Sequence, residues 1–329
     1  MGGGQGEAMS AIARNKLTSP PRVFLLAALL GILLLLLPGC SREDPPTKVD
    51  LSKRVPNASL IATQDNTQFS FGIGSMITPK EGFKHYRQFV SYLGQKLELP
   101  IRTIERGTYE EVNELLEKQQ LDAAFICGGP YVEGKESFDL ELLVLPEGND
   151  GPVYYSYLII PSNSSARSLA DLRGKKFAFT DPKSNSGMIV PTYWLATMGE
   201  TPDSFFSKHI FTYAHDASIR AVMENLVDGA AVDSLIWDYM NNQNPAVGIK
   251  TRIIKISEPF GIPPLVVRPD LPLPRKEQLK QVLLNMHNDP DGKKILDGLH
   301  IKRFVIGKDS DYDSIRKMRD FLSQKADNR

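Results

Sequence analysis

Two separate stretches of the chain alternate short apolar runs with longer amphipathic ones, and this pattern restricts the fold more than any other feature. From Phe69 the sequence reads as a strand (FSFGIG), a helix, a strand (PIRTIE), a helix and a strand (LDAAFIC). The alternation restarts after Pro161 with KKFAFT. Strands that alternate with helices form parallel sheets with crossover helices. We therefore expect an α/β protein with two mostly parallel sheets, each flanked by helices.

Two extended apolar segments, VYYSYLII and PPLVVRP, separate the two runs. They predict two strands that cross between two lobes and form a hinge. The first lobe is then expected to comprise residues 68–158 and 264–329, and the second residues 159–263. A Thr108-x-x-Glu111 capping box predicts the start of the helix YEEVNELLEKQ.

The first forty residues resemble a lipoprotein signal peptide. Basic residues precede an apolar run from Val23 to Leu37, which ends in Leu37-Pro38-Gly39-Cys40. The run is shorter than the roughly 20 residues of a spanning helix. The ending resembles the bacterial lipobox, whose cysteine is acylated, although an ordinary secretory signal or a short transmembrane anchor is the alternative. We expect a signal peptide over 1–40, lipid attachment at Cys40, a flexible tether over 41–67, and an exported protein facing the periplasm or cell exterior.

Charge and cysteine content exclude several classes of protein. Lys plus Arg and Asp plus Glu number 39 each, so the net charge does not favour a nucleic-acid partner. Cys127 is the only cysteine besides Cys40, which leaves the exported part without an intramolecular disulfide. A lone cysteine at a strand end is more often a buried apolar residue than part of a cleft, and both readings of Cys127 stay open.

The segment TDPKSNSGMIVP, residues 180–191, concentrates hydrogen-bonding groups at the junction between a predicted strand and a helix. Ligands of parallel α/β proteins bind at this edge, where the helix presents unpaired N–H groups. Ser184 and Ser186 supply hydroxyl donors, Asn185 adds an amide, and Gly187 lets the main chain approach a ligand. Such a turn suits a tetrahedral oxyanion, whereas a simple helix cap is the alternative. Pro191 predicts that the helix starts nearby or bends there.

Three segments resemble one protein family. DPKSNSGMIVP looks like the Asp-Pro-x-Ser-x-Ser-Gly-x-x-x-Pro signature of the phosphonate, phosphite and phosphate binding proteins of ABC importers. YAHDASIRAVMENLVDGAAVDS is similar to the family's His-acid segment, and LDAAFICGGPYV to its strand-to-Gly-Pro loop. The likeness extends over residues 69 to 305, although Cys127-Gly128-Gly129-Pro130-Tyr131 departs from the family's aromatic-Gly-Pro pattern.

The resemblance implies a two-lobed type II periplasmic binding protein whose Ser-x-Ser-Gly turn holds the phosphorus-bound oxygens. Ser184, Asn185 and Ser186 inherit that role. Asp216 corresponds to a residue that contacts the ligand's amino group, and Asp233 lies where a second such carboxylate falls. A buried Asp216 would favour a zwitterionic aminoalkylphosphonate, whereas Asp216 as the N-cap of the following helix would carry no such meaning.

Three further side chains are expected near this ligand. Tyr131 follows LDAAFI in the first lobe, and Ser75 follows the first strand at the same edge. His215 could donate to a ligand oxygen, although a histidine before a helix is more often structural.

The expected function is capture of a phosphonate, phosphite or phosphate and its delivery to an ABC permease and its ATPase, by a monomer that needs no cofactor or metal. An enzyme is disfavoured: there is no Gly-x-Ser-x-Gly elbow, no phosphate-binding Gly-x4-Gly-Lys loop, and no metal-ligand spacing among the five histidines. A binding protein that signals to a membrane receptor kinase is the remaining alternative.

Overall fold

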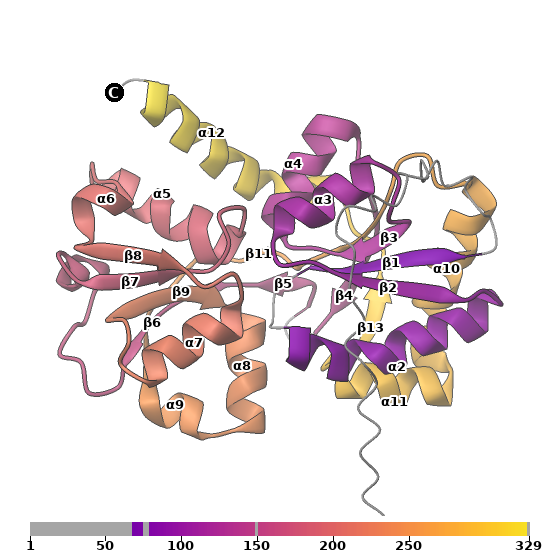
Figure 1. The fold of residues 1–329 in the computed structure, drawn as a ribbon, viewed down its shortest axis with the longest axis horizontal. Helices are drawn as coiled ribbons and strands as arrows, with labels where there is room; N and C mark the ends of the chain where they lie inside the picture. Colours follow the sequence, from indigo (N-terminus) through magenta and orange to yellow (C-terminus); the bar gives the residue numbers. More distant parts are fainter. Residues whose placement is uncertain (1–67, 75–78, 149–150, 328–329) are drawn as a thin grey trace, which may run out of the picture. The chain divides into compact units, whose positions relative to one another are not determined.

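Two separate sheets organise the part of the chain that the computed structural model describes, residues 68–74, 79–148 and 151–327 (Figure 1). The predicted signal peptide and tether, with Cys40, lie outside these residues, as does Ser75. Among the helices within the three ranges, none is long and apolar enough to cross a membrane.

The first sheet has six strands in the order β13-β4-β12-β3-β1-β2. β1 pairs in parallel with β2 and β3, whereas β12 runs antiparallel to β3 and β4, and β13 antiparallel to β4. Its central strands are apolar along their length because helices cover both faces. The strands are β1 (Phe69–Ile73), β2 (Ile101–Glu105), β3 (Ala123–Phe125), β4 (Glu141–Glu147), β12 (Leu265–Val267) and β13 (Arg303–Val305).

Five helices pack on this sheet, and we call the sheet and these helices the first lobe. The predicted capping box is confirmed: the Thr108 side chain accepts from the Glu111 N–H, and the Glu111 carboxylate accepts from the Thr108 N–H. The segment after β3, expected to be a loop, is instead a helix that begins at Gly128. The helices are α2 (Pro79–Leu97), α3 (Tyr109–Glu117), α4 (Gly128–Phe138), α10 (Leu273–Asn285) and α11 (Pro290–Gly298).

The second sheet has five strands in the order β10-β6-β9-β7-β8. β7 is parallel to β8 and β9, whereas β6 is antiparallel to β9 and β10. Each sheet therefore has three parallel strands at one edge, β3-β1-β2 and β9-β7-β8, and antiparallel strands on the other side. The α/β fold is as expected, but the sheets are mixed and not mostly parallel. The strands are β6 (Ser156–Pro161), β7 (Lys176–Phe179), β8 (Lys208–Phe211), β9 (Gly229–Asp233) and β10 (Thr251–Ile256).

The helices around this sheet complete the second lobe. A single π-helical turn, η3 (Asn185–Ile189), leads into α5 (Val190–Thr197), so Pro191 lies in the first turn of the α-helix, where its missing N–H costs nothing. Of the two alternatives for Pro191, the helix starts beside it. The other helices are α6 (Pro202–Phe205), α7 (His215–Met223), α8 (Ser234–Gln243) and α9 (Ala246–Lys250).

Two short strands join the lobes. β5 (Val153–Tyr154) pairs antiparallel with β11 (Phe260–Gly261), so both crossings run side by side (Figure 1). The segment VYYSYLII was expected to be one strand, but it divides at Tyr155, whose N–H donates to the Ser234 hydroxyl instead of to a strand partner. The C-terminal helix α12 (Asp313–Asp327) packs on α4 of the first lobe and α5 of the second.

Candidate functional site

The segment of residues 180 to 187, which we call the anion turn, follows β7 and runs into the π-helical turn. It is buried except at Pro182, which is exposed, and Lys183, which is half-buried. Ser184 is the N-cap, and its hydroxyl oxygen accepts from the Gly187 N–H at 3.1 Å. The Ser184 carbonyl accepts from the N–H groups of Met188 and Ile189. The side chains of Ser184, Asn185 and Ser186 have no exposed surface. The turn therefore belongs to the interior of the protein and is more than a cap on a surface helix.

Gly187 is required by its contact with Thr180. A Cβ on Gly187 would collide with the Thr180 side chain, and the Thr180 N–H donates to the Gly187 carbonyl at 3.3 Å. The absence of a side chain at Gly187 thus allows the two ends of the anion turn to approach each other.

Four buried polar atoms at this place have no hydrogen-bond partner among the described residues. They are the hydroxyls of Thr180, Ser186 and Tyr109 and the side-chain oxygen of Asn185. The pKa of Tyr109 is raised well above its usual value, first by burial and then by neighbours that include Cys127 and Asp181, so its hydroxyl keeps its proton and can donate. Buried polar groups are nearly always paired in folded proteins, and an unpaired one costs about 1–3 kcal/mol. Such a cluster is suited to a polar ligand.

His215 orients Ser184 as a donor. The Asp233 N–H donates to His215 Nδ1 at 3.0 Å, and burial lowers the pKa of His215 to about 3, so the imidazole is neutral. Its proton is then on Nε2, which lies 3.5 Å from the Ser184 hydroxyl oxygen. Because that oxygen accepts from Gly187 and faces Nε2–H, the Ser184 proton is left to donate elsewhere.

This arrangement is the reverse of a nucleophilic serine, whose histidine must accept the hydroxyl proton. An Nε2 that carries a proton cannot act as the general base for Ser184. Among the described residues there is also no group of three or more His, Cys, Asp or Glu side chains that could hold a metal ion.

Asp233 contacts His215, which faces Ser184 of the anion turn, and Asp233 also lines a cavity. Its side chain caps α8 by accepting from the Leu235 N–H at 2.8 Å. Burial raises the pKa of Asp233 to about 7, against the opposing hydrogen bonds from the N–H groups of Leu235 and Ile236. The residue lines a cavity of about 230 Å³.

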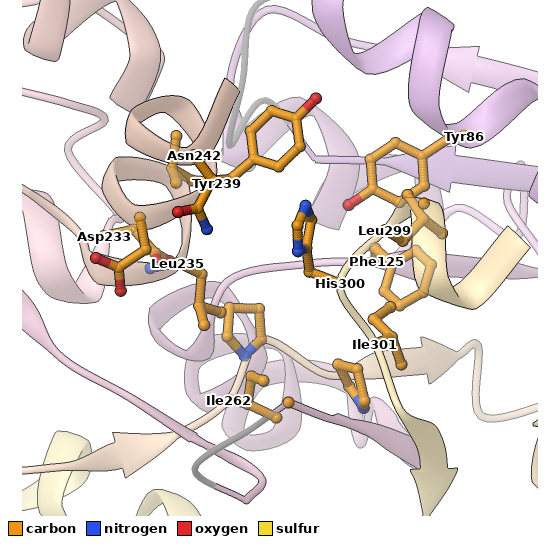
Figure 2. A pocket seen from close by; sticks show the side chains of 16 residues that line it. Tyr86, Phe125, Asp233, Leu235, Tyr239, Asn242, Ile262, Leu299, His300 and Ile301 are labelled. Carbon is orange, nitrogen blue, oxygen red and sulfur yellow. The ribbon is translucent and has the colours of Figure 1, made fainter. Parts of the chain in front are cut away.

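The cavity is largely aromatic and apolar (Figure 2). Asp233, Tyr239 and Asn242 line it on one side, Tyr86 and Phe125 on the other, with His300 between them. The Tyr239 and His300 rings meet edge to face at 5.5 Å between centroids. The 16 lining side chains, all within the described ranges, include no Lys or Arg. A negatively charged substituent would therefore be disfavoured here, and a positively charged one would meet Asp233.

Asp216 does not cap α7, because the helix begins at His215 and Ala214 is the N-cap. The expectation that Asp216 could be an N-cap was therefore wrong. Its carboxylate, only 2% exposed, accepts from the Arg220 guanidinium one turn later. A carboxylate already paired with a guanidinium attracts a second cation less strongly than an unpaired one.

Tyr131 is not brought to the anion turn. Its hydroxyl donates to Asp309 at 2.7 Å, and its ring packs on Tyr312 at 4.6 Å. Both partners are about 180 residues away in sequence. The position of Tyr131 after β3 could therefore not reveal these contacts, and it suggested a ligand contact instead.

Cys127 is both buried and next to the anion turn. Its sulfur accepts from the N–H groups of Asn185 and Gly129 and lies 3.8 Å from the Tyr154 hydroxyl. Burial nevertheless raises the pKa of Cys127, so it is a neutral thiol. Of the two alternatives for this residue, burial is observed, and Cys127 is not among the residues that line the cavity described above.

Sequence reasoning missed Tyr109, Tyr154 and Thr180. Tyr109 begins α3 directly after β2, at the same edge of the sheet as the other candidates, so its position was a usable signal. Tyr154 accepts from the Asn185 amide at 2.9 Å, but it lies in a crossing strand that carries no such signal.

Two α/β lobes joined by paired crossing strands, with a turn of buried uncharged donors and a cavity lined by both lobes, have the fold of a type II periplasmic binding protein. Residues 71–312 match the family model described as "ABC transporter, phosphonate, periplasmic substrate-binding protein". The chain belongs to this family, whose members are substrate-binding transport proteins of the periplasm.

Individual relatives agree with this family. A probable ABC transporter phosphite binding protein, PhnD1, from Prochlorococcus marinus is 23% identical over 247 residues, which cover 71% of this chain and 83% of the relative. A solved binding protein component of an ABC phosphonate transporter from Pseudomonas aeruginosa superposes with a TM-score of 0.74 at 22% identity, covering 79% of this chain and 87% of that one. PhnD1 from Prochlorococcus marinus in complex with methylphosphonate superposes with a TM-score of 0.71 at 21% identity, covering 78% of this chain and 98% of that one. At these identities the structural likeness concerns the fold.

Proposed function

We propose that this chain is a lipid-anchored solute-binding protein that captures a phosphorus oxyanion at the anion turn and delivers it to an ABC importer. The observation that carries the proposal is the group of buried hydroxyls without partners, those of Ser186, Thr180 and Tyr109. A phosphonate offers three acceptor oxygens, so it would pair these donors and relieve the cost of burying them.

Uncharged donors suit a protein that must also release its ligand. Ser184 adds a fourth hydroxyl whose proton is free, as its bonds to Gly187 and His215 indicate. Hydrogen bonds to a charged acceptor contribute about 1.5–3 kcal/mol each, so a few of them hold an oxyanion without a buried Lys or Arg.

The cavity favours a phosphonate with a basic substituent over phosphate or phosphite. A protonated amine next to Asp233 would favour the ionised carboxylate and so oppose the effect of burial on its pKa. The aromatic side chains of Tyr86, Phe125 and Tyr239 would pack around the carbon chain and the cation. We therefore propose an aminoalkylphosphonate as the ligand class, with Asp233 in the role that the sequence suggested for Asp216.

Attachment through Cys40 is part of the proposal and rests on the Leu37-Pro38-Gly39-Cys40 ending after the apolar run. Incorporation of labelled palmitate into the full chain, lost in Cys40→Ala, is the expected result. Equal labelling of both proteins would contradict it.

A thermal-shift panel tests the ligand class. Sulfate, phosphate, phosphite, methylphosphonate and 2-aminoethylphosphonate are compared at the same concentration, and 2-aminoethylphosphonate is expected to raise the melting temperature most. A ligand at a hundred times its Kd adds about 2.7 kcal/mol to the free energy of unfolding. A panel in which no phosphorus compound shifts the melting temperature would overturn the proposed function, and a larger shift with phosphate would overturn the ligand class.

A further inference from the structure

The anion turn makes direct contact with the first lobe through Asp181. This residue belongs to the second lobe and is only 1% exposed. One carboxylate oxygen accepts from the Lys183 N–H of the same turn at 2.8 Å. The other accepts from the N–H of Tyr109 in the first lobe at 3.0 Å, across 72 residues of sequence.

Tyr109 N–H is a first-turn donor that α3 cannot pair by itself. The first N–H groups of an α-helix have no intrahelical acceptor. In α3 the capping box pairs the N–H groups of Glu111 and Thr108 but not those of Tyr109 and Glu110 in the same turn. Asp181 supplies the missing acceptor, and its negative charge lies at the positive end of the helix dipole.

Neighbouring contacts bring the same two surfaces together. Lys183 forms an ion pair with Glu133 of α4 at 2.6 Å, and both side chains are about one-third exposed. Gly129 lets the Lys183 carbonyl approach α4, because a Cβ at Gly129 would collide with that oxygen. The Lys183 pair is partly in water and contributes little, whereas the bond from Asp181 to Tyr109 is buried.

We propose that Asp181 is a positioning residue that holds the two lobes closed and thereby sets the affinity of the anion turn for its ligand. The inference rests on the proposed function. When the lobes separate, the carboxylate regains water and the Tyr109 N–H loses its acceptor. Burial is the main cause that raises the pKa of Asp181, and the bonds from Tyr109 and Lys183 oppose it. Desolvation and hydrogen bonding therefore act against each other at this carboxylate.

The affinity follows from the fraction of closed protein. A ligand that binds only the closed form has an apparent Kd equal to its intrinsic Kd divided by that fraction. Loss of a charge-assisted bond made only on closure lowers the fraction, and about a tenfold weaker apparent affinity is expected. All ligands should be affected by the same factor, because Asp181 acts on closure.

Hydrogen exchange of the Tyr109 amide in the wild-type protein is the first test. First-turn amides have no helical acceptor, so protection of this amide reports its bond to Asp181. Exchange is measured without ligand and with saturating phosphate, phosphite, methylphosphonate or 2-aminoethylphosphonate. We expect slower exchange with every compound that raises the melting temperature. A compound that raises the melting temperature but leaves this amide unprotected would overturn the role of Asp181 and leave the proposed function intact, and a panel with no thermal shift would overturn both.

Asp181→Asn and Asp181→Ala form the second test, with the exposed Asp320→Asn as the matched control. Calorimetry should show affinity falling in the order Asp, Asn, Ala with the preference among the four compounds unchanged, and small-angle scattering should show less ligand-induced compaction. A changed preference, or unchanged affinity and compaction, would overturn the inference. If Asp181→Ala does not fold, the Asn variant and the exchange measurement decide.

Discussion

Ser186 is the residue at which binding and stability are most clearly separated. Its side chain has no exposed surface, its hydroxyl has no partner among the described residues, and its carbonyl is held by the Ser156 hydroxyl at 2.6 Å. A group selected for folding alone would be paired. The hydroxyl therefore lowers the stability of the free protein, and under the proposed function a ligand oxygen would pair it.

Replacement of Ser186 by alanine is expected to leave the free energy of unfolding unchanged or slightly higher, because an unpaired buried hydroxyl is removed. Affinity for the best compound of the panel should fall about 10-fold to 100-fold, since one charge-assisted hydrogen bond of about 1.5–3 kcal/mol is lost. Calorimetric titration and thermal unfolding measure the two effects. The exposed Ser207→Ala is the control. A variant that binds normally but unfolds more easily would assign Ser186 to the fold instead.

His215 and Asp233 are expected to give opposite pH dependences of stability. The pKa of His215 is lowered to about 3, so its contribution is present above pH 6.5 and is lost as pH falls toward 3. The pKa of Asp233 is raised to about 7, so its contribution is present below about pH 4 and is lost as pH rises toward 7. Between about pH 4 and 6.5, the contribution of His215 to stability rises with pH and that of Asp233 falls.

Each single variant should show the pH dependence of stability that the other residue causes. For ligand-free Asp233→Asn, stability should rise more steeply than that of the wild type from pH 4 to 6.5. For His215→Gln it should fall across the same range. Denaturant unfolding at half-unit pH steps measures both. Parallel curves for the three proteins would show that neither pKa is shifted.

At the scale of elements, the anion turn combines one close approach with a π-helical turn. Thr180 lies against Gly187, and the π-helical turn then passes into α5. A π turn has poorer backbone geometry than an α-helix and is frequent at functional sites. Here it places three consecutive buried polar side chains before the first α-helical residue.

Gly187→Ala is expected to destabilise the protein by about 1–3 kcal/mol through overpacking against Thr180. Thr180→Ala should recover part of this loss in the double variant, because the side-chain oxygen and methyl group that meet the new Cβ are removed. Denaturant unfolding of the two single variants and the double variant measures the coupling. Strictly additive effects would mean that the two residues do not share this contact.

The elements could be predicted where their causes are local. The capping box of α3 depends on residues three apart, and the strands of the two sheets are short apolar runs that any window reveals. The anion turn was predicted for the same reason. Contacts across long sequence separations could not be predicted: Tyr131 with Asp309, Tyr109 with Asp181, and the break at Tyr155 that divides β5 from β6. Asp216 was misassigned as a possible cap because the start of a helix cannot be located to one residue from sequence.

At the scale of the whole molecule, the segment proposed to bind the ligand is also one at which the lobes meet. Gly129 of α4 faces the Lys183 carbonyl, and Asn185 reaches Tyr154 of the crossing strand. Binding and closure are therefore expected to be coupled through residues 180 to 187. Of the boundaries proposed for the lobes, 68–158 with 264–329 and 159–263, the one after residue 263 follows the crossing strand β11, whereas the one after residue 158 falls within β6 of the second sheet.

Gly129→Ala should separate the lobes and leave each of them folded. The new Cβ collides with a main-chain oxygen of the other lobe, so the closed form is disfavoured while contacts within each lobe are retained. We expect at least a tenfold loss of affinity and a larger radius of gyration with ligand, by calorimetry and small-angle scattering. Gly107→Ala is the control, since a Cβ there makes only ordinary contact. Normal affinity in Gly129→Ala would mean that closure does not require this approach.

A crystal structure of the protein with 2-aminoethylphosphonate tests the central claim most directly. The account predicts phosphorus-bound oxygens within hydrogen-bonding distance of the Ser184 and Ser186 hydroxyls, with the amine beside Asp233. A ligand bound elsewhere, with both serine hydroxyls without a ligand oxygen, would contradict it.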